Sequence, residues 1–169
     1  DGGAYELKQA IAQFVGVASE QVVIGNGSNE VLELVARVFA GPSDEIIYSQ
    51  YGFAVYPISA QVVGATGVEV PAKDWGHDLT AMLEAITDNT KVIYIANPNN
   101  PTGTFFTKSE WEAFISKVPE NVVVVLDEAY LEYADSFLTE EQQFNGADYL
   151  ESNANPVSYT HLRAHETAT

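Results

Sequence analysis

Asp127 and Tyr130 follow a continuous apolar run, residues 122–126, that consists of four valines and one leucine. A run of this kind is typical of a strand that is buried on both faces of a parallel sheet. In open parallel sheets, ligands bind outside the carboxyl ends of the strands. We therefore expect the Asp127 carboxylate to point into a ligand site, which the nearby Tyr130 can share. The alternative is that Asp127 caps the helix that follows.

A second polar segment, residues 97–103, has the sequence Asn-Pro-Asn-Asn-Pro-Thr-Gly and follows another expected buried strand, residues 91–95. Two prolines restrict its backbone, so its amide side chains are expected to be held over the crevice at the carboxyl end of that strand. Asn-Pro and Pro-Thr-Gly are also good turn formers, and an ordinary turn is the alternative.

A third segment, residues 25–29, reads Gly-Asn-Gly-Ser-Asn and lies between a short apolar stretch and an amphipathic pattern. This order is typical of a turn from a strand into a helix. The N-terminus of a helix presents free backbone N–H groups and a positive dipole end, so a phosphate fits there. Neither a Walker pattern nor G-x-G-x-x-G is present. An ordinary capped turn and a non-catalytic phosphate- or nucleotide-binding module therefore stay open.

The elements that must position these residues alternate between strands and helices. Short β-branched runs predict strands, and apolar residues at helical spacing predict helices. The alternation indicates an α/β fold with a mostly parallel sheet and flanking helices, a three-layer α/β/α arrangement. Strands are expected at residues 21–24, 45–48, 68–71, 91–95 and 122–126, and helices at residues 7–15, 31–38, 54–63, 78–87 and 107–115.

Composition excludes several classes of protein. The formal net charge of −17, from 24 acidic and 7 basic residues, disfavours binding to nucleic acid or to an anionic membrane surface. Apart from Asp127, most of the acidic residues that accumulate after Lys117 are expected on a solvated face. The sequence lacks an apolar run of the roughly 18 residues that cross a bilayer. It also lacks cysteine, which fits a reducing compartment such as the cytoplasm.

The last residues, 157–169, have neither turn chemistry nor a core stripe. They resemble translated vector or sequencing-adapter read-through, and we expect them to be a non-native tail. His161 and His165 have helical i, i+4 spacing, but no third ligand is evident and no metal site is expected.

Four segments occur in the order and approximate spacing of motifs in fold-type I aminotransferases, which use pyridoxal 5′-phosphate. These segments are residues 25–30, 51–56, 97–103 and 127–130. Within this superfamily the closest resemblance is to the histidinol-phosphate aminotransferase family, and it covers residues 1–156. It implies a partial cofactor-binding large domain that comes from a homodimeric, cytoplasmic enzyme of histidine biosynthesis. The implied substrates are small molecules, an amino acid or amino-alcohol phosphate and 2-oxoglutarate, with neither nucleic acid nor membrane as partner.

The resemblance also implies a role for each motif. Asp127 would pair with the protonated pyridine nitrogen of the cofactor, and Asn100 and Tyr130 would hydrogen-bond its phenolic oxygen. Phe53 would stack on the ring. The phosphate would be held by Ser28 and Asn29 at the start of a helix.

One part of the family pattern is missing. The family places the lysine that forms the Schiff base in a Ser-Lys motif after the aspartate motif. All five lysines of this chain precede Asp127, namely Lys8, Lys73, Lys91, Lys108 and Lys117. We therefore expect a segment truncated at both ends that does not transaminate by itself. Another class I/II aminotransferase, or a related decarboxylase that acts on a phosphate substrate, is the alternative for the parent protein.

Overall fold

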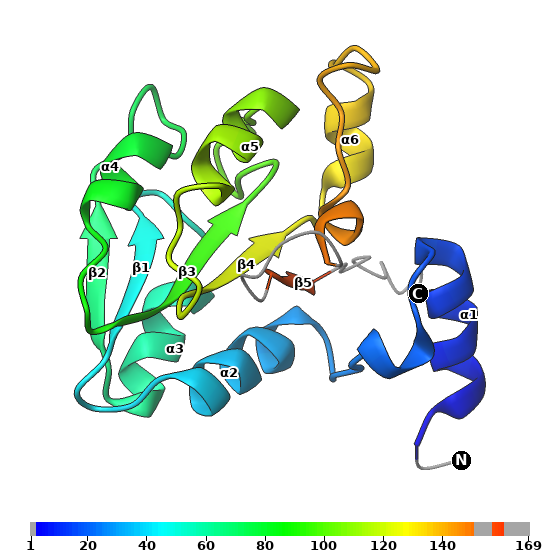
Figure 1. The fold of residues 1–169 in the computed structure, drawn as a ribbon, viewed down its shortest axis with the longest axis horizontal. Coiled ribbons are helices and arrows are strands. Elements are labelled where there is room, and N and C mark those ends of the chain that lie inside the picture. The colour runs from blue at the N-terminus through cyan, green and yellow to red at the C-terminus, as the bar shows by residue number, and fades with distance from the viewer. Residues whose placement is uncertain (1–2, 151–156, 161–169) are drawn as a thin grey trace.

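The computed structural model describes residues 3–150 and 157–160, and a five-stranded sheet in the order β2-β1-β3-β4-β5 forms its centre (Figure 1). Each pair of neighbouring strands is parallel. The parallel sheet expected from the sequence is confirmed. The strands are Glu45–Ser49 (β1), Thr66–Val70 (β2), Thr90–Ala96 (β3), Val123–Asp127 (β4) and Val157–Thr160 (β5).

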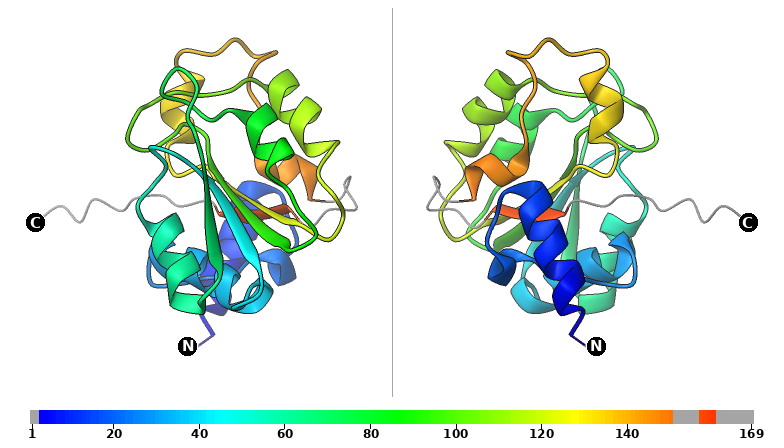
Figure 2. Two further views of the ribbon diagram at one scale, coloured as in Figure 1. Left: turned by 90° about the vertical axis from the view of Figure 1, so that its left-hand side faces the viewer. Right: turned by 90° about the vertical axis from the view of Figure 1, so that its right-hand side faces the viewer.

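Helices cover both faces of the sheet. Figure 2 shows α2 and α3 on one side and α4 and α5 on the other, with the strands between the two layers. This arrangement agrees with the three layers that the alternation of elements predicts. The four helices are Ser28–Phe39 (α2), Val55–Val63 (α3), Leu79–Glu84 (α4) and Lys108–Ile115 (α5).

Strand β4 shows how the sheet joins two cores. Val123 and Val125 pack in a cluster with residues of α2 and α3. Val124 and Leu126 pack in a second cluster with residues of α4 and α5. Because successive side chains of a strand point to opposite faces, a run that is apolar at every position is what a doubly covered strand requires.

Local signals set the start of two helices at the carboxyl edge of the sheet and the end of a third at the opposite edge. Thr107 and Glu110 form the expected capping box at the start of α5. The Asp78 side chain accepts a hydrogen bond from the backbone N–H of Ala81 and begins α4. Gly64, with φ 73°, ends α3 in the left-handed conformation that suits glycine.

Four further elements of the described residues lie outside this framework. They are Tyr5–Val15 (α1), Ser19–Gln21 (η1), Leu131–Asp135 (α6) and Gly146–Tyr149 (η2). Glu128 is an exception to the solvated acidic face expected for most acidic residues after Lys117, because it is fully buried. Its carboxylate accepts a hydrogen bond from the backbone N–H of Gly146 and so ties η2 to the end of β4.

The strand expected at residues 21–24 is also wrong. Residues 19–21 form the turn η1, and residues 22–25 follow without regular structure. A strand needs a neighbour that pairs with its backbone, and in the part of the chain that the structure describes the sheet does not include this segment. Val22 alone is buried there, whereas Val23 is largely exposed.

The suspected tail lies partly within the described residues. Residues 157–160 form β5, which pairs with β4 from Val124 opposite Val157 to Asp127 opposite Thr160. The two histidines of the tail lie outside the described residues, and the non-native origin of residues 157–169 stays a prediction. Within residues 3–150 and 157–160, no helix is long and apolar enough to cross a membrane.

Candidate cofactor-binding site

The order of the strands locates the candidate site. The chain moves from β1 outward to β2 and then returns to the other side of β1 with β3. Ligands of open α/β sheets bind at the carboxyl ends of the strands, next to such a reversal. The segments that leave β1 and β3 at this point are residues 50–54 and 97–103. The first includes most of the predicted motif 51–56, and the second is the predicted motif 97–103.

Asp127 is the last residue of β4 and continues the alternation of Val123 and Val125 toward the α2/α3 face. Its side chain is only 6% exposed. One carboxylate oxygen accepts a hydrogen bond from the Tyr56 hydroxyl at 3.0 Å, and the other accepts one from the backbone N–H of Ala129 at 3.1 Å. Burial raises the pKa of Asp127 above its usual value, although both hydrogen bonds oppose that shift. The structure thus places this carboxylate at the end of a buried strand, as the sequence predicts.

Tyr56 is a site residue that the sequence did not single out. It lies in the first turn of α3 and is fully buried. Its ring stacks on Tyr94 of β3 with centroids 5.0 Å apart and planes 2° from parallel. Burial first, and then the nearby Asp127 carboxylate, raise the pKa of Tyr56 well above its usual value. The hydroxyl therefore stays protonated and donates its hydrogen bond to Asp127.

The segment at 97–103 is held at both ends by amide side chains. Asn97 receives a hydrogen bond from the backbone N–H of Phe106 at 3.0 Å and donates one to the carbonyl of Phe106 at 3.2 Å. The Asn99 amide nitrogen donates to the carbonyl of Tyr51 and to the Thr102 hydroxyl. Asn99 Oδ1 is buried and has no hydrogen-bond partner. The peptide bonds that precede Pro98 and Pro101 are both cis.

Asn100 and Tyr130 lie together. Both line a pocket of about 570 Å³ that is bordered by the loop after β3 and by α6. The backbone N–H of Asn97 donates to the carbonyl of Asp127 at 2.9 Å, so the same loop is tied directly to the end of β4. The structure therefore brings three of the predicted residues, Asn100, Asp127 and Tyr130, to one edge of the sheet.

Ser28 and Asn29 begin α2, as the sequence predicts. The residue before them, Gly27, has φ 81° and supplies no side-chain cap. The hydroxyl of Ser28 lies 3.5 Å from Asn29 Oδ1. In Figure 1, α2 runs beneath the sheet opposite in direction to β4, so its N-terminal end lies toward the end of β4 that carries Asp127. An uncapped helix start with polar side chains suits an anion.

The loop after β1 contains two aromatic rings with different surroundings. Phe53, the residue expected to stack on a ligand ring, is partly buried and meets Tyr56 edge-on with centroids 5.9 Å apart. Tyr51 is 45% exposed, and its ring lies 5.0 Å from that of Trp75. Tyr51 and Trp75 have φ of 59° and 67°, and strained backbone of this kind in non-glycine residues is concentrated at functional sites. Tyr51 is therefore a second candidate for contact with a ligand ring, and its residue type alone does not identify it.

The model of the family described as aminotransferase class I and II matches residues 2–151. The chain belongs to this family. It is 63% identical over 169 residues to histidinol-phosphate aminotransferase 2 of Hydrogenovibrio crunogenus, an alignment that covers 99% of this chain and 44% of that protein. The chain thus spans less than half the length of this curated relative.

Solved structures of aminotransferases share the fold. Histidinol-phosphate aminotransferase from Sinorhizobium meliloti, in complex with pyridoxal-5′-phosphate, superposes with a TM-score of 0.76 at 29% identity, over 84% of this chain and 38% of that one. Aspartate aminotransferase from Thermus thermophilus with maleate gives a TM-score of 0.72 at 27% identity, over 83% and 38% of the two chains. The sheet edge described above is therefore part of an aminotransferase fold.

Proposed function

We propose that the protein to which this segment belongs is a pyridoxal-phosphate-dependent aminotransferase that exchanges an amino group between histidinol phosphate and 2-oxoglutarate, a step of histidine biosynthesis. The observation that carries this proposal is the 63% identity, over 99% of the chain, to a protein named histidinol-phosphate aminotransferase 2.

The residues of the candidate site fit the cofactor. Asp127 is a buried carboxylate at the carboxyl edge of the sheet, suited to hold a protonated ring nitrogen. The uncapped start of α2 is suited to a phosphate. Asn99 Oδ1 is a buried acceptor without a hydrogen-bond partner, so the loop can accept one more hydrogen bond from a ligand.

When bound, the cofactor supplies an electron sink for the pair of electrons left at the substrate Cα. Asp127 would accept a hydrogen bond from the ring nitrogen, and its negative charge would keep the proton on that nitrogen. Tyr56 would orient the carboxylate for this contact, because its hydroxyl occupies the second carboxylate oxygen.

The remaining predicted residues would fix the orientation of the cofactor. Asn100 and Tyr130 would hydrogen-bond its phenolic oxygen, and Phe53 would cover one face of the ring. The phosphate would be bound by Ser28, Asn29 and the first backbone N–H groups of α2. Together these contacts would hold the ring in a fixed position relative to a bound substrate.

The Schiff-base lysine lies elsewhere in our proposal. The five lysines of the chain all precede Asp127, whereas the family motif places the catalytic lysine after it. We therefore assign the lysine to the part of the relatives' length that this chain does not span. This segment contributes the binding and orientation half of the site.

We also propose that the parent enzyme is a cytoplasmic homodimer that acts on small molecules. The absence of cysteine from the sequence is compatible with a reducing compartment. Tyr133 and Phe137, on and after α6, are 71% and 78% exposed, and apolar surface of this kind is suited to cover by another chain or by a further domain.

Expression of the full-length reading frame tests the substrate. Glutamate formation from 2-oxoglutarate would be measured with histidinol phosphate, aspartate, tyrosine and alanine as amino donors, and we expect histidinol phosphate to be preferred. Turnover of aspartate or tyrosine with none of histidinol phosphate would support another aminotransferase of the same fold. Histidinol phosphate has no carboxyl group, so a phosphorylated amino acid is added to the donors, and release of carbon dioxide from it in place of glutamate would support a decarboxylase. The exposed Asp88→Asn variant is the control for Asp127→Asn, which should abolish turnover.

Cofactor binding can be tested on the 169-residue chain itself. Pyridoxine 5′-phosphate is the probe, because it lacks the aldehyde and cannot react with surface lysines. We expect saturable binding and thermal stabilisation that Asp127→Ala removes. Stabilisation by ATP with none by pyridoxine 5′-phosphate would instead support the nucleotide-binding alternative.

A further inference from the structure

His77 occupies an unusual position at the end of β3. Its Nε2 lies 2.9 Å from the carbonyl oxygen of Ala96 and 3.2 Å from the backbone nitrogen of the same residue. Ala96 is the last residue of β3 and lies opposite Asp127 in the pairing with β4. The imidazole therefore touches the backbone next to the candidate site from a loop that the predicted motifs do not include.

The topology explains why a side chain is needed there. Strands β1 and β3 pair only as far as Tyr48 opposite Tyr94, so Ile95 and Ala96, the last two residues of β3, are not paired with β1. Along a strand, the N–H and C=O groups of successive residues point to alternate sides. The N–H of Asn97 points to β4, where it donates to Asp127. The N–H and C=O of Ala96 consequently point to the side on which β1 no longer pairs with β3, and His77 contacts them there.

The two contacts cannot both be hydrogen bonds, because one ring nitrogen either carries a proton or offers a lone pair. The shorter distance favours Nε2–H donating to the Ala96 carbonyl. Nδ1 then holds the lone pair, and it is buried without a hydrogen-bond partner. A charged ring would leave an N–H without an acceptor at that buried atom, which costs free energy. The neutral ring protonated at Nε2 is therefore the form that fits.

The same ring also supports the loop that carries Asn100. His77 meets Phe106 edge-on, with centroids 6.3 Å apart. The backbone N–H and C=O of Phe106 form hydrogen bonds with the side chain of Asn97. His77 thus contacts both ends of the segment from Asn97 to Phe106, through Ala96 on one side and the Phe106 ring on the other.

We propose that His77 is a positioning residue whose neutral imidazole takes the place of a missing strand at the end of β3 and holds the Asn100 loop in register with Asp127. The inference deepens the proposed function, on which its catalytic relevance rests. The contacts of His77 with Ala96 and Phe106 do not depend on the function of the parent protein.

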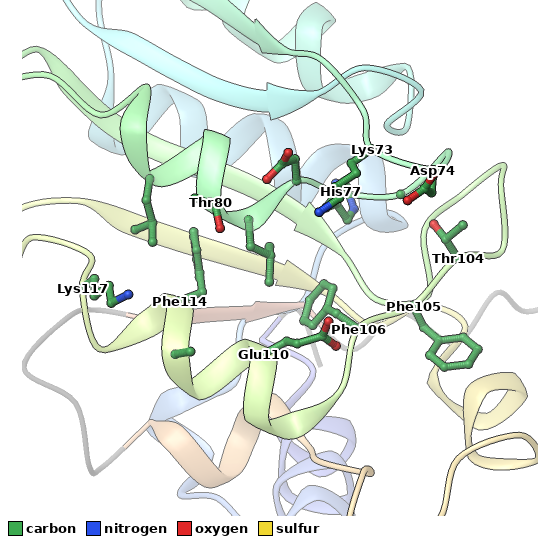
Figure 3. Close-up of a pocket in the computed structure, with 15 residues that line it drawn as sticks. Lys73, Asp74, His77, Thr80, Thr104, Phe105, Phe106, Glu110, Phe114 and Lys117 are labelled. Carbon is green, nitrogen blue, oxygen red and sulfur yellow. The ribbon is translucent and has the colours of Figure 1, made fainter.

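Charged groups near His77 do not supply an alternative partner. Figure 3 shows His77 in the lining of a pocket of about 490 Å³ beside α4 and α5. The carboxylates of Asp78 and Glu110 in that lining accept hydrogen bonds from the backbone N–H groups of Ala81 and Thr107. The other charged residues of the lining are Lys73, Asp74 and Lys117. Burial lowers the pKa of His77 to about 4, and the hydrogen bond to Ala96 opposes this shift.

The unsubstituted chain provides the first test. Nitrogen-15 NMR distinguishes the two neutral tautomers and the charged ring, and the spectrum of His77→Phe assigns the His77 signals among the three histidines of the sequence. We expect the Nε2–H tautomer at pH 7. A charged ring or the Nδ1–H tautomer at that pH would overturn the proposal. The variant serves only to assign the signals, and the tautomer is read from the unsubstituted chain.

Two substitutions provide the second test. His77→Phe replaces the imidazole with an aromatic ring that has no nitrogen, whereas the amide of His77→Gln can still donate to Ala96. We expect faster amide exchange at Ala96, Asn97 and Asn100 in the phenylalanine variant and recovery in the glutamine variant. Affinity for pyridoxine 5′-phosphate should follow the same order, with a roughly three- to tenfold loss in His77→Phe. His161→Gln is the matched control, because it removes a histidine distant in sequence from residues 77–106.

The outcomes separate this inference from the proposed function. Altered exchange in His77→Phe, in a chain that does not bind pyridoxine 5′-phosphate, would uphold the positioning of the loop and contradict the cofactor assignment. Normal binding by the unsubstituted chain, with exchange and affinity unchanged in His77→Phe, would overturn the role of His77 and leave the function intact.

Discussion

The hydroxyl of Tyr56 lies 3.0 Å from Oδ2 of Asp127, a residue that is 71 positions later in the chain. The contact joins the first turn of α3 to the end of β4. The Tyr56 hydroxyl also occupies one of the two carboxylate oxygens. The orientation of Asp127 therefore depends on α3, a helix that is separated from β4 in sequence by β2 and β3.

Tyr56→Phe should weaken both the fold and the site. The substitution removes one buried hydrogen bond to a carboxylate, and we expect the free energy of unfolding to fall by about 1–3 kcal/mol. Affinity for pyridoxine 5′-phosphate should fall as well, because Asp127 loses its orientation. Urea denaturation and calorimetric titration measure the two effects. Tyr5→Phe, at a residue of α1 that is 66% exposed, should change neither, and an equal effect in both variants would contradict the prediction.

Asp127→Asn should separate stability from binding. Burial raises the pKa of Asp127 in the folded state, so the ionised form is disfavoured there, and stability is lost as the pH rises through the folded pKa. The neutral amide avoids this cost, and we expect an unfolding free energy at pH 7 equal to or above that of the unsubstituted chain. Binding of pyridoxine 5′-phosphate should nevertheless disappear. A marked loss of stability would show that the carboxylate supports the fold.

His77 should make the chain sensitive to mild acid. Its pKa falls from 6.5 to about 4 on folding, so the stabilisation is complete above pH 6.5 and is lost as the pH falls toward 4. The loss is at most about 3 kcal/mol. Thermal unfolding from pH 7.5 to 4 should show this decline in the unsubstituted chain and a smaller one in His77→Phe. Ionisation of Asp127 changes the stability with pH in the opposite direction. The unsubstituted chain and His77→Phe are therefore compared at each pH.

Ser28→Asp should stabilise α2 and oppose the phosphate. A carboxylate in the first turn of a helix interacts favourably with the dipole, by about 0.5 kcal/mol. The same charge repels a phosphate bound there, and affinity for pyridoxine 5′-phosphate should fall at least about fivefold. Pyridoxine without the phosphate should bind the two chains equally. Unchanged affinity for the phosphate ester would place the anion away from α2.

The parts of the site that follow local rules were predictable. A run that is apolar at every position identified β4, and its end identified Asp127. The paired prolines and amides identified the loop that contains Asn100. These inferences need only the neighbours of each residue in sequence, because burial on both faces and turn chemistry are local properties.

Contacts between distant segments were not predictable in the same way. Tyr56 meets Asp127 because of how α3 packs on the sheet, and nothing in its own segment specifies that partner. His77 is a single histidine in a loop, and its role depends on β1 ending before β3. Residues 21–24 have strand-like composition but no strand to pair with among the described residues.

The stacked pair of Tyr56 and Tyr94 gives the buried site an optical signal of its own. Two phenol rings whose centroids lie 5.0 Å apart, with planes 2° from parallel, are close enough for their electronic transitions to couple. One ring touches Asp127 through its hydroxyl. Near-ultraviolet circular dichroism, taken as the difference between the unsubstituted chain and Tyr56→Phe, can therefore follow assembly of this edge of the sheet without a label or a ligand.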